Sequence, residues 1–199
     1  MGPRYAGVAT CDRLKSYGWV ARLQWCWAHL RRDFRALIDR DNEGRAIGQA
    51  LLEQSNTLFH LWHQVKQGTQ SRARFRAAIR PVRRAVRRAV RRGQACGGSK
   101  TAGTGKEWLA HERWLWTFVD VDGVEPTNNT GERAERQGVL WRKTSGGTDS
   151  AHGSRFVERV LTVVQTCRQQ GKDVLDYLSA CIEARRHGRA PPPLLAAGL

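Results

Sequence analysis

Residues 69–92 constrain the fold more than any other segment, because valine and arginine alternate there with the period of a helix. Val82, Val86 and Val90 recur at every fourth residue. The positions between them are mostly arginine, at Arg83, Arg84, Arg87, Arg88, Arg91 and Arg92. Coiled into a helix, this segment has a thin apolar stripe flanked by a broad cationic face. We therefore expect a helix with one side packed and the other side positively charged.

The arginine segment also supplies most of the net charge of the chain. No Asp or Glu lies between Glu53 and Glu107, and the 34 Lys and Arg against 18 Asp and Glu give a net charge of +16. An excess of this size indicates a polyanionic partner, most commonly nucleic acid. We expect the guanidinium groups to contact the DNA backbone. The alternatives are a solvated face balanced by an acidic partner, and disorder of the segment when unbound.

The overall composition excludes several classes of protein. A hydrophobic content of 40% over 199 residues, with eight Trp, is typical of a folded chain. The five cysteines are scattered without a CxxC pair, which argues against a disulfide framework and a four-cysteine zinc site. No apolar run is long enough for a membrane span, and we find no signal peptide. We expect a cytoplasmic, nucleoid-associated protein without a membrane partner or a small-molecule substrate.

Four further segments have the spacing of amphipathic helices. They are residues 25–38, 47–65, 156–164 and 174–182. Gly68, Gly171 and Gly188 are expected to end three of these helices. The small, polar stretch 93–105 is typical of a flexible loop.

The remaining segments predict shorter elements. Residues 5–11 indicate a strand that ends at Asp12. The aromatic run 114–119 favours either a short strand or the end of a helix. Residues 126–130 predict the start of a helix, with Asn129 or Thr130 as its cap and Glu132 in its first turn.

Two motifs resemble a known family. One begins Pro126-Thr-Asn-Asn-Thr-Gly-Glu132-Arg133, and its similarity continues to residue 178. The other is Cys11-Asp12-Arg13 followed by Gln24-Trp-Cys-Trp-Ala-His-Leu-Arg-Arg-Asp-Phe34. Together they resemble the insertion sequence 66 family of DDE-type transposases, in its C-terminal portion.

The resemblance implies an α/β, mostly helical chain with a partial RNase H-like fold and an arginine-rich helical insertion. In that family three carboxylates bind two divalent metal ions, Mg²⁺ or Mn²⁺, which cleave and join DNA. Asp12 matches the second carboxylate and Glu132 the third, so both are expected catalytic metal ligands. The partners implied are transposon ends and target DNA. The expected divisions are residues 1–34 (core remnant with the second acid), 35–113 (basic insertion), 114–187 (end of the core with the third acid) and 188–199 (tail).

The first carboxylate of the family has no counterpart here, because no Asp or Glu precedes Asp12. We expect a truncated, degenerate or split transposase that lacks the first strands and is inactive alone. The alternative function is a non-enzymatic DNA-binding remnant, or an inhibitory subunit that joins full-length transposase protomers. A third interpretation is a basic protein that binds RNA or the ribosome.

Several residues near the motifs have two interpretations each. Asn128 and Asn129 are either DNA contacts or capping residues. A second basic set is expected either to hold phosphates or to aid solubility: Arg133, Arg136, Arg142, Lys143 and Arg155. Cys26 and His29 favour a buried thiol beside a partly buried histidine over a zinc pair. The tryptophans are expected mostly in the core, with one or two able to stack on an unpaired base.

Overall fold

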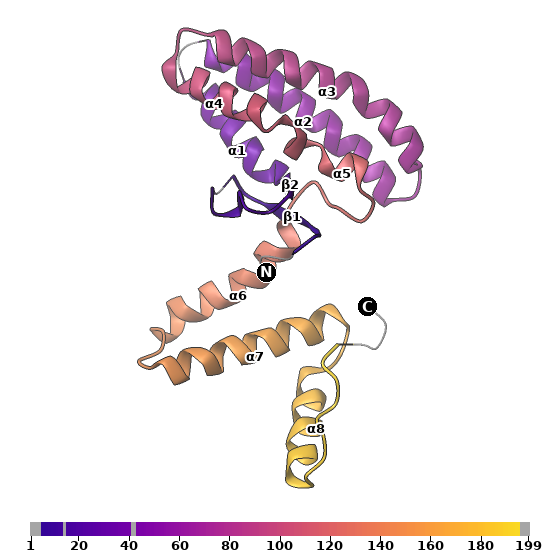
Figure 1. The fold of residues 1–199 in the computed structure, drawn as a ribbon, viewed down its shortest axis with the longest axis vertical. Coiled ribbons are helices and arrows are strands. Elements are labelled where there is room, and N and C mark those ends of the chain that lie inside the picture. Colours follow the sequence, from indigo (N-terminus) through magenta and orange to yellow (C-terminus); the bar gives the residue numbers. More distant parts are fainter. Residues whose placement is uncertain (1–4, 14, 41–42, 196–199) are drawn as a thin grey trace. The chain divides into compact units, whose positions relative to one another are not determined.

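A parallel pair of short strands opens the structure, a computed structural model that describes residues 5–13, 15–40 and 43–195. Strand β1 (Val8–Cys11) pairs with β2 (Arg22–Trp25) (Figure 1). In this pairing Cys11 lies opposite Trp25. The connection between them contains a short 3₁₀ helix, η1 (Lys15–Tyr17). The predicted first strand is thus confirmed over four residues. The second was not predicted, because three of its four side chains are buried and the pattern does not alternate.

Four helices follow, and each packs on the next one along the chain (Figure 1). They are α1 (Trp27–Ile38), α2 (Gly44–Lys66), α3 (Arg72–Ala95) and α4 (Ser99–Ala110). The helices predicted over 25–38 and 47–65 are confirmed as α1 and α2. Their buried residues join one hydrophobic core with those of the sheet.

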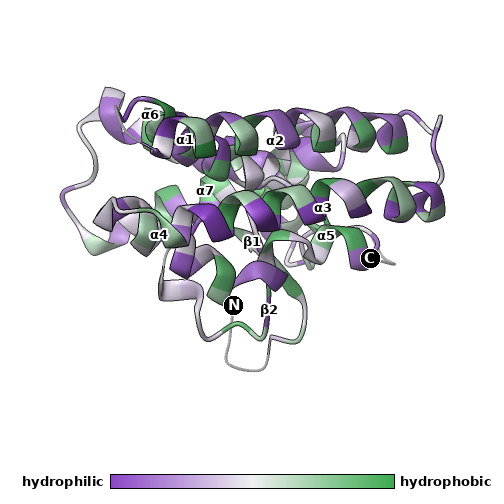
Figure 2. Cartoon of the chain, turned by 90° about the horizontal axis from the view of Figure 1, so that it is seen from above, coloured by the Kyte–Doolittle hydropathy of each residue, from purple (hydrophilic) through white to green (hydrophobic). Residues whose placement is uncertain are grey.

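The valine and arginine segment forms α3, as predicted. Ser71 caps its N-terminus, because the Ser71 hydroxyl accepts a hydrogen bond from the Arg74 backbone nitrogen. Val82, Val86 and Val90 are all buried. The alternation of hydrophilic and hydrophobic bands along α3 is visible in Figure 2. The packed side and the charged side of this helix are therefore distinct.

The prediction of a loop over residues 93–105 is wrong. Helix α3 continues to Ala95, and α4 begins at Ser99 after a short turn. Gly105 allows α4 to pack closely on α3, because a Cβ at this position would lie 2.6 Å from the backbone nitrogen of Gln94. Trp108, which is buried, anchors the far end of α4 in the core.

The aromatic run 114–119 is helical, so the strand alternative is wrong. It spans the 3₁₀ helix η2 (Glu112–Leu115) and the single turn α5 (Thr117–Asp120). Both elements contact β2. Buried Gln24 of β2 joins them to the sheet: its side-chain oxygen accepts a hydrogen bond from the Phe118 backbone nitrogen, and its amide donates to the Leu115 carbonyl. Side-chain hydrogen bonds thus replace a third strand at this edge.

The chain divides into two compact units, residues 1–129 and 130–199. The second unit contains most of α6 (Asn129–Ser145), together with α7 (Ala151–Gln169) and α8 (Val174–Arg186). The predicted helices of the tail are confirmed, although α7 begins five residues before Phe156. Ser150 and Asp173 cap α7 and α8.

The described part of the chain is mostly helical and contains a two-stranded sheet, which confirms the coarse fold prediction. The RNase H-like assignment stays a prediction. No described helix has the length and apolarity that crossing a membrane requires.

Candidate nucleic-acid interface

Arginines on one flank of α3 form contacts with other residues of the protein. The Arg72 Nε lies 3.0 Å from the Asp122 Oδ1, and the Arg76 Nη2 lies 3.1 Å from the same oxygen. Arg72 also donates a 2.8 Å hydrogen bond to the Phe118 carbonyl, and its guanidinium lies 5.2 Å from the centre of the Trp62 ring. Both arginines therefore hold α5 and the turn after it against α3.

The same flank continues with Arg83 and Arg87, two of the six arginines expected to contact DNA. The Arg83 guanidinium lies over the Trp116 ring, 5.7 Å from its centre, and Arg83 is half-buried. The Arg87 Nε lies 3.3 Å from the Glu112 Oε2. These contacts hold η2 and the start of α5 against α3. A partner that binds Arg83 or Arg87 must therefore compete with a contact inside the protein.

A second row of arginines points away from the core. Arg80, Arg84, Arg88 and Arg91 are exposed, and none has an ion pair with a residue that the structure describes. At 1.5 Å per residue the row is about 16 Å long. Arg92 is also exposed, to one side of the row. A polyanion can reach these five cations without breaking the fold, and we call the five together the arginine row.

Asp12 directly follows the last residue of β1 and is half-buried. Its neighbour Arg13 is fixed by two carboxylates, Asp33 at 3.0 Å and Glu107 at 2.7 Å. Burial raises the pKa of Asp33 above its ordinary value, and the Arg13 charge offsets part of that rise. Burial, with a contribution from the Asp12 charge, raises the pKa of the Cys11 thiol to about 11.

The two sequence motifs meet in the first unit. The Asn128 backbone nitrogen donates to the Cys26 Sγ at 3.3 Å, across 102 residues of chain. Next to it, the Trp27 backbone nitrogen donates to the Pro126 carbonyl at 2.9 Å. Cys26 is almost fully buried and His29 is half-buried, as expected for a buried thiol beside a partly buried histidine, and the zinc pair stays an alternative. The segment that leads to Glu132 is therefore attached to the start of α1.

Glu132 lies in the first turn of α6, which begins at Asn129, as predicted. Four of the five basic residues expected beside it are also on α6 and are exposed: Arg133, Arg136, Arg142 and Lys143. The fifth, Arg155, is exposed on α7. Helical spacing places Arg133, Arg136 and Lys143 on one side of α6 and Arg142 on the other. Only three of the four can therefore act on a common surface.

Comparison with known proteins decides the family. A family model described as transposase IS66 family matches residues 1–155. The chain belongs to the transposase IS66 family. An uncharacterized protein of Sinorhizobium fredii (strain NBRC 101917 / NGR234), y4qI, is 31% identical over 182 residues, which is 88% of this chain and 33% of that protein. The chain thus spans about a third of the length of this relative. No solved structure matches this chain.

In this IS66-family chain, sequence reasoning missed two features of the surface. Arg80 belongs to the arginine row, and its position four residues before Arg84 was a signal that could have shown it. A pocket lined by Trp25, His111 and Trp114 was missed as well. No spacing rule connects these three residues, because they come together only when η2 packs on β2.

Proposed function

We propose that this chain forms part of a transposase that acts on transposon ends. The observation that carries the proposal is the contact between Asn128 and Cys26, because it joins the two motifs that characterise the family resemblance. Family membership supports a role in transposition. Since the chain spans a third of y4qI, the activity of a whole transposase is part of the proposal.

Asp12 and Glu132 are the proposed metal ligands. Asp12 offers a half-buried carboxylate at a strand end, and Glu132 offers one in the first turn of a helix. Carboxylate oxygens are the donors that Mg²⁺ or Mn²⁺ prefers, so the donor type fits. Transposases of this class generally use divalent metals. When bound, such ions stabilise charge on the attacking and leaving oxygens of a phosphodiester.

We propose that Asp12 and Glu132 supply two of the three carboxylates of an RNase H-like site. In this arrangement residues 1–34 and 114–187 are core, residues 35–113 are the basic insertion, and 188–199 are a tail.

The arginine row is the proposed contact for the DNA backbone. Its guanidinium groups project from a helix whose other side is packed, so binding needs no unfolding. Neutralising phosphates releases counterions, and the affinity should fall steeply with salt. Asn128 and Asn129 with the basic residues of α6 would add contacts near Glu132.

Nicking of terminal-repeat DNA tests the enzymatic proposal. Purified chain, alone and mixed with a full-length IS66-family transposase, is incubated with labelled terminal-repeat duplex and Mg²⁺ or Mn²⁺. The expected result is metal-dependent cleavage when the chain is mixed with a full-length partner whose own third carboxylate is inactivated, and no cleavage when the chain also carries Glu132→Gln. Cleavage that persists with both substitutions would refute the assignment of Glu132.

A second candidate function is DNA binding without catalysis. The arginine row favours it, because the row lies in the first unit and depends on neither proposed ligand for its support. Salt-sensitive binding to duplex DNA, together with inhibition of the full-length transposase, would select this candidate. Stronger binding to duplex RNA than to DNA would argue against both.

A further inference from the structure

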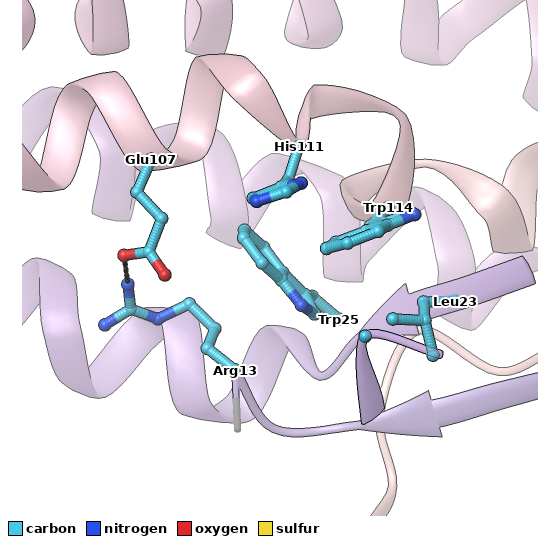
Figure 3. Close-up of a pocket in the computed structure, with 7 residues that line it drawn as sticks. Arg13, Leu23, Trp25, Glu107, His111 and Trp114 are labelled. Atoms are coloured by element: carbon cyan, nitrogen blue, oxygen red, sulfur yellow. Dashed lines mark hydrogen bonds and ion pairs between the residues drawn. The ribbon is translucent and has the colours of Figure 1, made fainter. Parts of the chain in front are cut away.

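An aromatic pocket opens in the first unit beside the end of β1 (Figure 3). Its volume is about 600 Å³. The residues that define it come from the strand ends, α4 and the turn into η2: Arg13, Gly18, Trp25, Glu107, His111 and Trp114. None of them is used by the function proposed above, so the pocket needs its own explanation.

The wall of the pocket is a stack of planar rings. The rings of His111 and Trp114 are parallel, with centres 4.1 Å apart and an interplanar angle of 2°. Trp25 meets each of them edge-on at 5.3 Å. Trp25 is buried, whereas His111 and Trp114 are half-buried. The accessible wall therefore favours a flat, aromatic ligand.

The mouth of the pocket is polar and charged. Glu107 and Arg13 are paired there through one carboxylate oxygen at 2.7 Å, and their side chains are 38% and 25% exposed. Arg13 can donate to a ring carbonyl, and Glu107 can accept from an amino or imino group. A planar ring with both donors and acceptors satisfies the wall and the mouth together, and a nucleobase has this chemistry.

The position of the pocket indicates where such a base would come from. Arg13 follows the proposed metal ligand Asp12, so the mouth lies one residue from the site that would hold DNA. The exposed Arg113 lies over the Trp114 ring at 5.7 Å and adds positive charge. Trp19, which follows Gly18, is 52% exposed and offers a further indole. A phosphate backbone near Asp12 would bring its bases within reach of these rings.

We propose that this pocket binds a single nucleobase displaced from the DNA helix. The inference rests on the proposed function, because it needs DNA at Asp12. A displaced base loses stacking on its neighbours, and the His111 and Trp114 wall replaces it. Loss of one aromatic platform should weaken binding of such a base by about tenfold.

The test compares two duplexes that differ in one base. Each carries 2-aminopurine, either paired within the helix or unpaired as a single extrahelical base, and the binding of the full chain is followed by anisotropy and by 2-aminopurine fluorescence. We expect about tenfold tighter binding of the unpaired duplex and quenching of its fluorescence by stacking. Equal affinities with unchanged fluorescence would overturn the pocket proposal, and this comparison needs no variant.

Variants then assign the effect to the pocket. Trp114→Ala and His111→Leu should remove the preference for the unpaired base while keeping affinity for the paired duplex. The matched control Arg88→Ala should weaken both duplexes equally. A preference that survives both pocket variants, in proteins with unchanged circular dichroism, would place the base elsewhere and refute the proposal.

Two further results separate the sources of failure. If the chain binds neither duplex, the proposed DNA function fails before the pocket is tested. Free deoxynucleotides provide the other control. If the pocket takes a base that DNA carries, free deoxynucleotides should compete for it only at millimolar concentration. Competition by deoxynucleotides at micromolar concentration would contradict the proposal and indicate a site for free nucleotides.

Discussion

The guanidinium of Arg13 lies 2.7 Å from the Glu107 carboxylate, although 94 residues separate them in the chain. Its second amino group lies 3.0 Å from Asp33. One side chain therefore joins the end of β1 to α1 and to α4. This junction fixes the position of the residue after Asp12, whichever partner Asp12 binds.

The first prediction concerns the loss of this junction. Arg13→Gln should lower the free energy of unfolding at pH 7 by about 1–2 kcal/mol, because two partly buried carboxylates lose their countercharge. Urea denaturation measures the loss. Arg35→Gln, on the exposed side of α1, is the control and should change stability little.

The same junction predicts a pH dependence. The pKa of Asp33 is raised in the folded state, so ionisation of Asp33 opposes folding. The free energy of unfolding should therefore fall as pH rises through the range just above 3.8, the ordinary pKa of this carboxyl. Without Arg13 this fall should be larger. The difference between Arg13→Gln and the unchanged protein should therefore vanish below that range and be greatest above it. A difference that stays constant from pH 3 to pH 7 would be inconsistent with this account.

A second prediction separates the two kinds of arginine on α3. Arg84→Gln with Arg88→Gln should reduce the salt dependence of DNA binding by about one unit of log–log slope for each phosphate that is no longer neutralised. The unfolding free energy should hardly change, because both side chains are exposed. Fluorescence anisotropy across a range of salt concentrations gives the slope. An unaltered slope would mean that the row does not touch phosphates.

The flank of α3 should respond in the opposite way. Arg72→Gln removes an ion pair with Asp122, hydrogen bonds to backbone carbonyls and the contact with Trp62. We expect a loss of about 2 kcal/mol in unfolding free energy, since partly buried carbonyls lose their donor. DNA affinity of the folded variant should change less than in the Arg84 and Arg88 double variant. Thermal denaturation and anisotropy on the same samples compare the two.

A fourth prediction concerns the packing of α4 on α3. Gly105→Ala should destabilise the protein by about 1–3 kcal/mol, because the added Cβ would lie 2.6 Å from the Gln94 backbone nitrogen. Gly103→Ala, two residues earlier on the same helix, meets nothing within 4 Å and should be neutral or stabilising by up to about 1 kcal/mol. Equal effects of the two substitutions in thermal denaturation would exclude a close backbone contact.

The sequence was sufficient for the elements whose side chains repeat with a clear period. Val82, Val86 and Val90 predicted α3, and similar stripes predicted α1, α2 and the tail helices. It failed for α4, because Gly103 and Gly105 are as compatible with a loop as with a tightly packed helix. Strand β2 was missed because it is buried on both faces. The segment 114–119 is hydrogen-bonded to Gln24, about 90 residues away in the chain, and no local pattern reveals that contact.

The candidate surface could be predicted only in part. Periodicity identifies Arg83, Arg84, Arg87 and Arg88 equally well, yet Trp116 and Glu112 engage Arg83 and Arg87. Those partners lie far along the chain from the arginines, and no local pattern pairs them. The proposed roles of Asp12 and Glu132 came from the resemblance and not from a pattern in the sequence.

The close approach of Gly105 to Gln94 also affects the thermodynamics of binding. It joins α4 to the C-terminal end of α3 main chain to main chain, which restrains that end of the helix. A polyanion that binds the arginine row then meets charges at a preset spacing and orders only side chains. Calorimetry should accordingly show a small heat-capacity change on association, in contrast to the large one of a basic segment that folds as it binds.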